Sequence, residues 1–262
     1  MTDTPAIEAR RLCAAYHRQP VLTDITLALP AGQWTAIVGP NGAGKSSLLK
    51  VVTGSLQPLS GELRILGGSA NQQRRAGKIA YMAQQEQMEW DFPVSVRETV
   101  MTGRYGLMRQ DPWWQRLMPD HWANPAHRRA VEEALEAVDM RDHAAGPIGE
   151  LSGGQKKRVM LARALAQQAD ILLLDEPLAG VDPPSERLIL DMLERERRAG
   201  RTIIMVTHDL PSARRHADQV ALINQTLVGM GPPAEMLSDA MLAQLAVGVA
   251  PRSTAGGVRA AA

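Results

Sequence analysis

The chain has 262 residues, 45% of them hydrophobic, which is enough to bury one large core or two modest lobes. Its 29 Lys and Arg residues nearly balance its 28 Asp and Glu residues, so the net charge of +1 gives no electrostatic reason to expect nucleic acid as the main partner. Cys13 is the only cysteine, which excludes an internal disulfide and any cysteine-rich zinc site.

The first residues lack the charged and then apolar run of a signal peptide. No apolar stretch approaches the ~20 residues that a membrane-spanning helix requires. From these two observations we expect a soluble, cytoplasmic protein.

Residues 7–38 alternate apolar and polar positions in short blocks, separated by turn residues at 18–20 and 30–32. This pattern predicts a small antiparallel sheet that leads into a buried strand at 35–38. Tyr16 lies in that sheet. Its ring is either a stacking surface for an adenine base or an ordinary half-buried side chain, and position alone favours neither.

A glycine-rich loop follows the strand at 35–38 and precedes a helical pattern at 47–52. Its glycines permit a tight turn whose backbone N–H groups point at phosphate oxygens, and the next helix adds its positive end. Lys45 would reach the β- and γ-phosphates, and the Ser46 hydroxyl would contact Mg²⁺. The residues predicted to hold a nucleotide here are Gly39, Pro40, Asn41, Gly42, Ala43, Gly44, Lys45, Ser46 and Ser47.

Residues 55–82 are predicted to continue in short strands, at 61–66 and at 78–82. From about residue 86 the pattern changes to helical periods, which predicts a helical lobe over about 86–165 inserted into an α/β core. Proline breaks interrupt it at Pro93, Pro112, Pro119 and Pro125. Its tryptophan-rich middle, 113–122, either contacts a partner or lipid headgroups or forms an aromatic mini-core that pins a loop.

A second anion site is predicted where residues 151–155 open a helix. Ser152 is suited to cap this helix, and Gly153 and Gly154 expose backbone N–H groups at its positive end, with Gln155 following. The sequence alone leaves this site without a ligand.

Acidic and imidazole side chains follow two predicted buried strands. The apolar run at 171–174 ends at Asp175 and Glu176, and the run at 202–206 is followed by His208. Ligands bind at the carboxyl ends of strands in open α/β sheets. Asp175 is therefore predicted to hold Mg²⁺, directly or through water, Glu176 to act as general base, and His208 to hydrogen-bond a γ-phosphate.

Together these motifs resemble those of the ATP-binding cassette (ABC) ATPases, over residues 7–237. Residues 39–46 are similar to the Walker A motif, 151–155 to the ABC signature and 172–176 to Walker B. The resemblance implies an α/β fold: an ABC-type P-loop ATPase core with a mostly parallel central sheet, an antiparallel β-subdomain and an inserted helical subdomain. Residues 1–247 would form this single domain, and 248–262, without periodicity, a disordered tail.

The resemblance also assigns roles that the residues alone do not. Gln84 would be the Q-loop glutamine, which contacts Mg²⁺, although Ala83 replaces a frequent proline and leaves Gln85 as the alternative. Asp182 would belong to the D-loop, His208 would be the switch histidine, and Tyr16 would stack on adenine. Lys45, Glu176 and His208 are the implied catalytic residues.

Family members form head-to-tail dimers. The resemblance thus implies a homodimer in which one subunit faces Ser152 and Gly154 of the other across ATP, and this would supply the missing ligand of the second anion site.

Residues 88–106 and 178–182 resemble the ATPase subunits of bacterial manganese, zinc and iron importers. This implies a separate integral-membrane permease, an extracytoplasmic metal-binding protein as an indirect partner, and a peripheral location on the inner face of the cell membrane. Trp90, Phe92 and Pro93 form either an apolar dock for a permease helix or a staple that fixes the next helix.

Three alternatives remain. The nearest is an ATPase for iron chelates such as haem or siderophores. A soluble ABC ATPase of DNA repair or translation would be expected to carry a coiled-coil insertion, zinc modules or a second cassette, and the sequence has none. A regulatory or scaffold protein predicts decay of Glu176, His208 or the signature, and all are intact.

Overall fold

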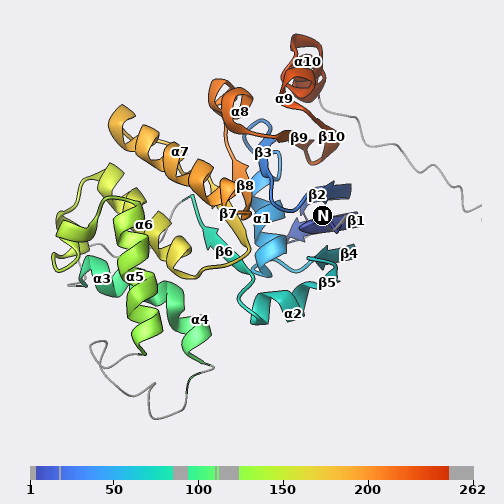
Figure 1. Ribbon diagram of the computed structural model, residues 1–262. Coiled ribbons are helices and arrows are strands. Elements are labelled where there is room, and N and C mark those ends of the chain that lie inside the picture. The colour runs from blue at the N-terminus through green and yellow to red at the C-terminus, as the bar shows by residue number, and fades with distance from the viewer. Residues whose placement is uncertain (1–3, 18, 85–93, 110, 112–123, 248–262) are drawn as a thin grey trace, which may run out of the picture.

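The computed structural model describes residues 4–17, 19–84, 94–109, 111 and 124–247, and these form two lobes (Figure 1). One lobe contains two β-sheets, and the other is helical. The predicted start of the helical lobe near residue 86, its tryptophan-rich middle and the predicted tail at 248–262 lie outside the described residues.

The first sheet is antiparallel and has the order β2 (Gln19–Leu29), β1 (Ile7–Tyr16), β4 (Ser60–Ile65) and β5 (Gly68–Ser69). Along β2, buried and exposed residues alternate from Leu22 onward in most positions, as a sheet with one covered face requires. The antiparallel sheet predicted from residues 7–38 is therefore confirmed.

The second sheet has the order β10 (Thr226–Gly231), β9 (Gln219–Asn224), β3 (Trp34–Val38), β8 (Thr202–Val206), β7 (Ile171–Asp175) and β6 (Ile79–Met82). Every pairing is parallel except β10 with β9. All residues of β3, β7 and β8 are buried, which explains why their sequences are mostly apolar. The carboxyl ends of these three strands therefore meet at one edge.

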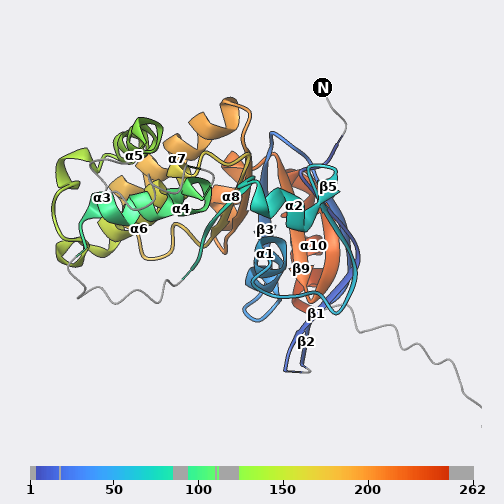
Figure 2. The ribbon, with the colours of Figure 1, turned by 90° about the horizontal axis from the view of Figure 1, so that it is seen from below.

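Helix α1 (Lys45–Thr53) packs its apolar side between the two sheets. Leu48 and Leu49 share one buried cluster with Leu12 of β1, Ile25 of β2 and Ile204 of β8. This packing fixes the start of α1, and with it the glycine-rich loop, at the carboxyl edge of the central sheet. Figure 2 shows α1 beside β3 in the view from below.

Helix α2 (Ala70–Arg75) corrects the expectation that residues 55–82 continue as strands. The helix buries none of its residues, and all of them after Ala70 are polar, so its sequence lacks the apolar period by which a helix is recognised. The strands predicted on either side of it are present as β4 and β6.

The described part of the helical lobe contains α3 (Val96–Met101), η1 (Thr102–Arg104), α4 (Tyr105–Met108), α5 (Pro125–Ala137), η4 (Arg141–His143), η5 (Ile148–Glu150) and α6 (Gly153–Ala166). Its core is continuous with the face of the central sheet that α7 (Pro183–Arg198) covers, since Leu161, Leu172 and Leu193 belong to one cluster. Figure 1 shows the lobe beside the end of the sheet that β6 forms.

The last described helices cover the same face of the sheet as α7, near its β9 end. Helices α8 (Leu210–His216), α9 (Pro233–Met236) and α10 (Asp239–Val247) surround a third buried cluster that includes Val38, Leu222 and Leu245. The short helix predicted at 232–237 is confirmed as α9, with Pro233 in its first turn.

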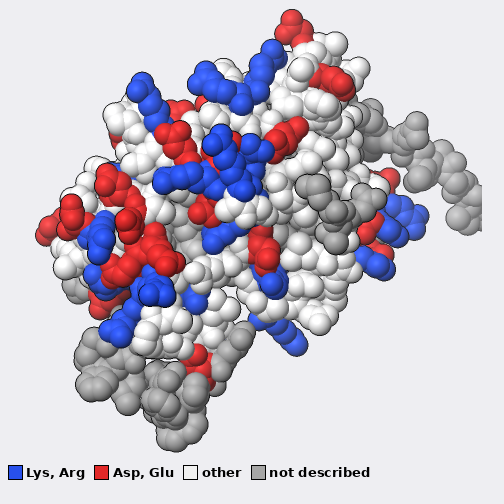
Figure 3. Space-filling model, in the orientation of Figure 1, with Lys and Arg blue, Asp and Glu red and all other residues white. Residues whose placement is uncertain are grey.

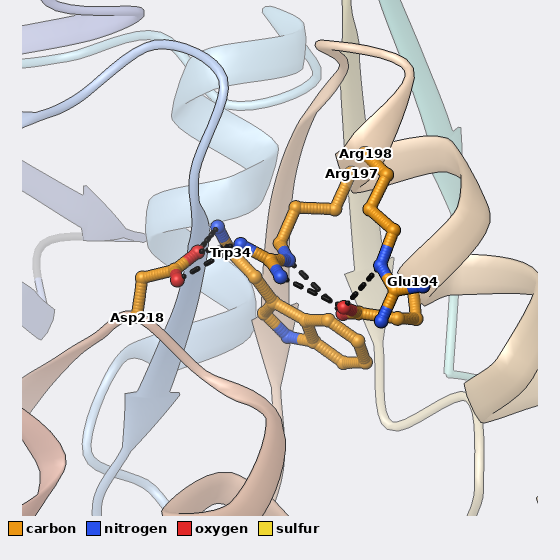
Figure 4. Close-up of polar contacts among 5 residues, drawn as sticks. All are labelled: Trp34, Glu194, Arg197, Arg198 and Asp218. Atoms are coloured by element: carbon orange, nitrogen blue, oxygen red, sulfur yellow. Dashed lines mark hydrogen bonds and ion pairs between the residues drawn. The ribbon is translucent and has the colours of Figure 1, made fainter.

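At the amino edge of the sheet, Asp218 joins the start of β3 to α7 (Figure 4). Its carboxylate Oδ2 accepts a hydrogen bond of 2.8 Å from the Trp34 backbone N–H, and its own N–H donates to the Trp34 carbonyl. Arg197 on α7 donates to Oδ1 over 3.0 Å and is itself paired with Glu194. These contacts fix the end of the strand that lies opposite the glycine-rich loop.

The surface carries charges of both signs. On the face that Figure 3 shows, Lys and Arg side chains lie next to Asp and Glu side chains over both lobes. Within the described part of the chain, no helix has the length and apolar character that crossing a membrane requires.

Candidate functional site

The glycine-rich loop between β3 and α1 is held against the backbone of two strands. A Cβ on Gly39 would lie 2.0 Å from the Ile223 carbonyl oxygen, and one on Gly44 would lie 2.4 Å from the Val21 carbonyl oxygen. Gly44 also has a φ of +89°, which a larger residue rarely adopts. Only glycine fits at these two positions, and no side chain caps α1, so the N–H groups of its first turn face an open pocket.

Lys45 places a buried ammonium group on this loop. Its Nζ donates to the carbonyl oxygens of Gly39 over 2.8 Å and Pro40 over 2.9 Å, and the residue is 6% exposed. Burial lowers the pKa of Lys45, while the charges of Glu176 and Asp175 oppose that shift. A desolvated cation at the mouth of the loop suits a phosphate anion.

Ser46 and Asp175 meet across the loop. The Ser46 hydroxyl donates to Asp175 Oδ1 over 3.0 Å, and the Tyr81 hydroxyl lies 3.5 Å from Oδ2. Asp175 is 2% exposed, and burial raises the pKa of its carboxyl group, with the Glu176 charge adding to the shift. A hydroxyl and a carboxylate are the oxygen ligands that Mg²⁺ prefers, and a divalent cation would relieve the buried negative charge.

Glu176 begins the loop after β7 in a strained backbone conformation, with a φ of +51°. Its N–H donates to the Val206 carbonyl oxygen over 3.0 Å, which aligns it with the end of β8. Its carboxylate Oε2 accepts a hydrogen bond of 2.8 Å from Gln84 Nε2 and lies 3.7 Å from His208 Nδ1. Strained residues of this kind concentrate at functional sites.

A single pocket brings together most of the glycine-rich loop residues predicted to hold a nucleotide. It is lined by Val21, Gln84 and Glu176 and by residues 41–47 of the loop and α1. Gln84 thus reaches the site, whereas the alternative, Gln85, lies outside the described residues. His208 is 67% exposed by side chain and borders a neighbouring pocket that Glu176 also lines.

The predicted second anion site lies elsewhere on the chain. Ser152 caps α6, its hydroxyl accepting from the Gln155 N–H while Gln155 Oε1 accepts from the Ser152 N–H. Ser152 and Gly153 are exposed, and Gly154 packs so closely on α7 that a Cβ would lie 2.6 Å from Asp182 Oδ1. Asp182 is itself the cap of α7. None of these residues lines the pocket at the glycine-rich loop.

Tyr16 lies at the end of β1, beside α1. It is 38% exposed, and the Lys50 ammonium is 5.8 Å from the centre of its ring. The ring is accessible enough to stack on a base but does not line the pocket at the loop, so both interpretations of Tyr16 remain.

Sequence reasoning missed two residues near the site. Tyr81 belongs to an apolar strand pattern that gives no sign of its contact with Asp175. Lys157 follows the signature closely in α6, and its Nζ donates to the Ala179 carbonyl oxygen in the loop after Glu176. Its place two residues past Gln155 was the available signal for it. Spacing along the chain does not predict the partner of either residue, because each contact joins two elements that are separate in the sequence.

A phosphate cradle between a strand and a helix, opposite an Asp and Glu pair at the end of a neighbouring parallel strand, defines a P-loop ATPase. Residues 22–179 match a family model described as ABC transporter. The chain belongs to this family, whose ATP-binding subunits bind and hydrolyse ATP.

Similar proteins cover nearly the whole chain. The manganese transport system ATP-binding protein MntA of Synechocystis is 44% identical over 82% of this chain and 79% of its own. MntB of Halalkalibacterium halodurans, another manganese transport system ATP-binding protein, is 38% identical over 92% and 91%. The zinc transport system ATP-binding protein TroB of Treponema pallidum is 39% identical over 86% and 81%.

Solved structures agree on the fold. A nucleotide-free ATP-binding cassette from an ABC transporter superposes with a TM-score of 0.77 at 22% identity, over 93% of this chain and 99% of the other. The cbiO1 protein of Clostridium perfringens, part of the ABC transporter complex cbiONQ, gives 0.73 at 27% identity, over 92% and 93%. The predicted ABC-type α/β fold is confirmed.

Proposed function

We propose that this chain is the ATP-hydrolysing subunit of a bacterial ABC importer for a divalent metal ion: manganese, zinc or iron. The observation that carries the metal assignment is the 38–44% identity, over 82–92% of the chain, to ATP-binding proteins of manganese and zinc transport systems. The contact between Ser46 and Asp175, beside Glu176, supports the chemistry.

Ser46, Asp175 and Gln84 would hold Mg²⁺, which would neutralise charge on the phosphates when it is bound with ATP. Lys45 would bind the β- and γ-phosphates, and the first-turn N–H groups of α1 would face the same oxygens. Glu176 would take the proton of the attacking water, and His208 would contact the γ-phosphate. The 2.8 Å hydrogen bond from Gln84 orients the Glu176 carboxylate for that step.

The active unit is a homodimer with head-to-tail subunits. Ser152 and Gly153 are exposed, and the signature residues do not line the pocket of their own chain, which leaves them accessible to a nucleotide held by a second copy. Each of two ATP molecules would then be bound by the loop of one subunit and the signature of the other.

Hydrolysis would drive transport through a separate membrane permease, with the ATPase bound at the inner face of the membrane and a metal-binding protein on the far side. The predicted apolar dock at Trp90, Phe92 and Pro93 lies outside the described residues and stays a prediction. Among the described residues, no group of three or more His, Cys, Asp or Glu side chains forms a metal-binding cluster. The transported metal would be cargo of the complex and not a cofactor of this chain.

Elemental analysis of the native host tests the proposal. Cells that carry the wild-type chain are compared with cells that carry Glu176→Gln, both under metal limitation and in a strain without parallel importers. A selective fall in manganese, zinc or iron is expected in the mutant cells, and it would name the ion. Unchanged contents of all three, with the variant protein present, would contradict metal import and favour an iron-chelate importer or a non-transport ATPase.

A further inference from the structure

Lys157 joins α6, the helix that begins at the signature and is called the signature helix below, to the loop that carries Glu176. It lies on α6, and its Nζ donates to the Ala179 carbonyl oxygen and lies 3.4 Å from the Glu176 carbonyl oxygen. The Ala179 N–H donates to that same Glu176 carbonyl over 3.3 Å, which closes the loop into a tight turn. One ammonium group therefore binds the turn that positions the predicted general base.

The contact differs from that of an ordinary surface lysine. Burial lowers the pKa of Lys157, and the Glu176 charge opposes that shift. A half-buried ammonium group has lost water, and backbone carbonyl oxygens replace some of the lost hydrogen bonds. Because Glu176 has a φ of +51°, its backbone is held in a conformation that needs support from its surroundings, and Lys157 supplies part of that support.

The same loop also touches the signature. It runs from Glu176 to Asp182, and Asp182 lies so close to Gly154 that no Cβ would fit between them. Helix α6 thus contacts the loop through Gly154 near its start and through Lys157 one turn later. A displacement of the signature helix would move the backbone of Glu176 as well.

We propose that Lys157 is a positioning residue that transmits a displacement of the signature helix to Glu176 of the same subunit. This inference rests on the proposed head-to-tail dimer, in which the signature contacts the ATP of the partner while Glu176 acts on the ATP of its own subunit. Closure around one nucleotide would then align the general base for the other, and the two sites would hydrolyse ATP cooperatively.

Steady-state ATP hydrolysis by the full chain tests the inference with three variants. Lys157→Met removes the charge and the donors at similar length, Lys157→Arg retains both, and Lys78→Met is the matched control. Lys78 pairs with Asp170 on the surface, 44% exposed, away from the pocket.

In Lys157→Met, kcat is expected to fall by about 10- to 100-fold, the range that a misplaced catalytic group produces. KM for ATP is expected to change by less than about threefold, because Lys157 does not line the nucleotide pocket and the contacts that bind ATP in the ground state are retained. The Hill coefficient for ATP should fall toward 1. Lys157→Arg should recover most of kcat, and Lys78→Met should match the wild type.

Two further measurements separate this inference from its premise. Gel filtration of Glu176→Gln with ATP and Mg²⁺ tests the proposed dimer alone, since Lys157 is intact in that variant. With the dimer present there, an unchanged kcat and Hill coefficient in Lys157→Met would overturn the role of Lys157. A second result would also overturn the role of Lys157: a loss of kcat in Lys157→Met that is accompanied by a lower melting temperature and is not recovered in Lys157→Arg. That result would show that the contact only stabilises the fold.

Discussion

The side-chain amide of Gln84 donates a 2.8 Å hydrogen bond to the carboxylate of Glu176, although 92 residues separate the two in the chain. Gln84 follows β6, Glu176 follows β7, and the parallel pairing of these strands brings their carboxyl ends together. The residue predicted to contact Mg²⁺ thus hydrogen-bonds the residue predicted to act as general base. This hydrogen bond connects the end of β6 directly to the predicted general base.

Glu176→Gln is expected to slow ATP hydrolysis by about 10²-fold or more, because the amide keeps the shape of the carboxylate but cannot accept the proton. Phosphate release under saturating ATP and Mg²⁺ measures the effect. Glu133→Gln, on the exposed side of α5, is the matched control and should retain the wild-type rate. If the variant hydrolysed ATP at a rate within a few fold of the wild-type rate, another group would have to accept the proton.

Ser152→Ala is expected to slow hydrolysis by about 10-fold or more without changing the affinity of the monomer for ATP, since Ser152 would contact only the nucleotide of the partner. Ser152 also caps α6, and loss of the cap costs about 1 kcal/mol of stability. Ser95→Ala provides the matched control, because Ser95 caps α3 through the same reciprocal arrangement with Glu98.

Both capping variants should melt at lower temperature, and only Ser152→Ala should lose activity. Fluorescence titration with a labelled nucleotide measures the affinity of the monomer, and phosphate release measures the rate. Equal losses of activity in the two variants would attribute the effect to helix stability rather than to contact with ATP.

Asp175→Asn is expected to stabilise the metal-free chain while abolishing hydrolysis. Burial raises the pKa of Asp175 above its ordinary value of 3.8, so the folded state holds this proton more tightly than the unfolded state. The contribution of Asp175 to folding stability therefore falls as pH rises from its pKa in the unfolded state through its pKa in the folded state. At neutral pH the charged carboxylate lowers the free energy of unfolding.

The amide removes that cost and still accepts from Ser46. The melting temperature at pH 7 in the presence of EDTA should rise for Asp175→Asn, and the difference from wild type should shrink as pH is lowered toward 3.8. Excess Mg²⁺ should stabilise the wild type more than the variant. A lowered melting temperature of the variant in EDTA would contradict the account of this buried carboxylate.

Asp218→Ala is expected to lower the free energy of unfolding by about 2 kcal/mol, since it leaves the buried Trp34 N–H without its acceptor and removes a partner of Arg197. The hydrolysis rate per folded molecule should stay unchanged, because Trp34 is the first residue of β3 and the pocket is lined by the loop that follows the last. Urea unfolding measures the first quantity. A fall in the rate without a loss of stability would contradict a purely structural role.

The sequence predicted the parts of the fold that burial determines. The apolar run that ends at Asp175 is buried at every residue of β7, so its pattern had one interpretation. Glycine spacing predicted the cradle for the same kind of reason, because Gly39 and Gly44 meet backbone that leaves no room for a Cβ.

The features that the sequence did not predict are exposed or depend on contacts between distant elements. Helix α2 buries no residue, so its sequence has no apolar period that would predict a helix. The contacts of Tyr81 with Asp175 and of Lys157 with Ala179 join elements that are far apart in the chain, and local pattern carries no information on such contacts. The residues of the second anion site do not line the pocket of their own chain, and in the proposed dimer their ligand would be held by another copy.

The molar mass of Glu176→Gln, measured by light scattering with and without ATP and Mg²⁺, tests the central claim that two nucleotides join two copies of this chain. Without nucleotide the account predicts 28.5 kDa, and with saturating ATP and Mg²⁺ it predicts twice 28.5 kDa with one nucleotide bound per chain. Adding Ser152→Arg to the same chain should block the larger species while the monomer still binds ATP. A mass of 28.5 kDa at saturating ATP and Mg²⁺ would contradict the shared site.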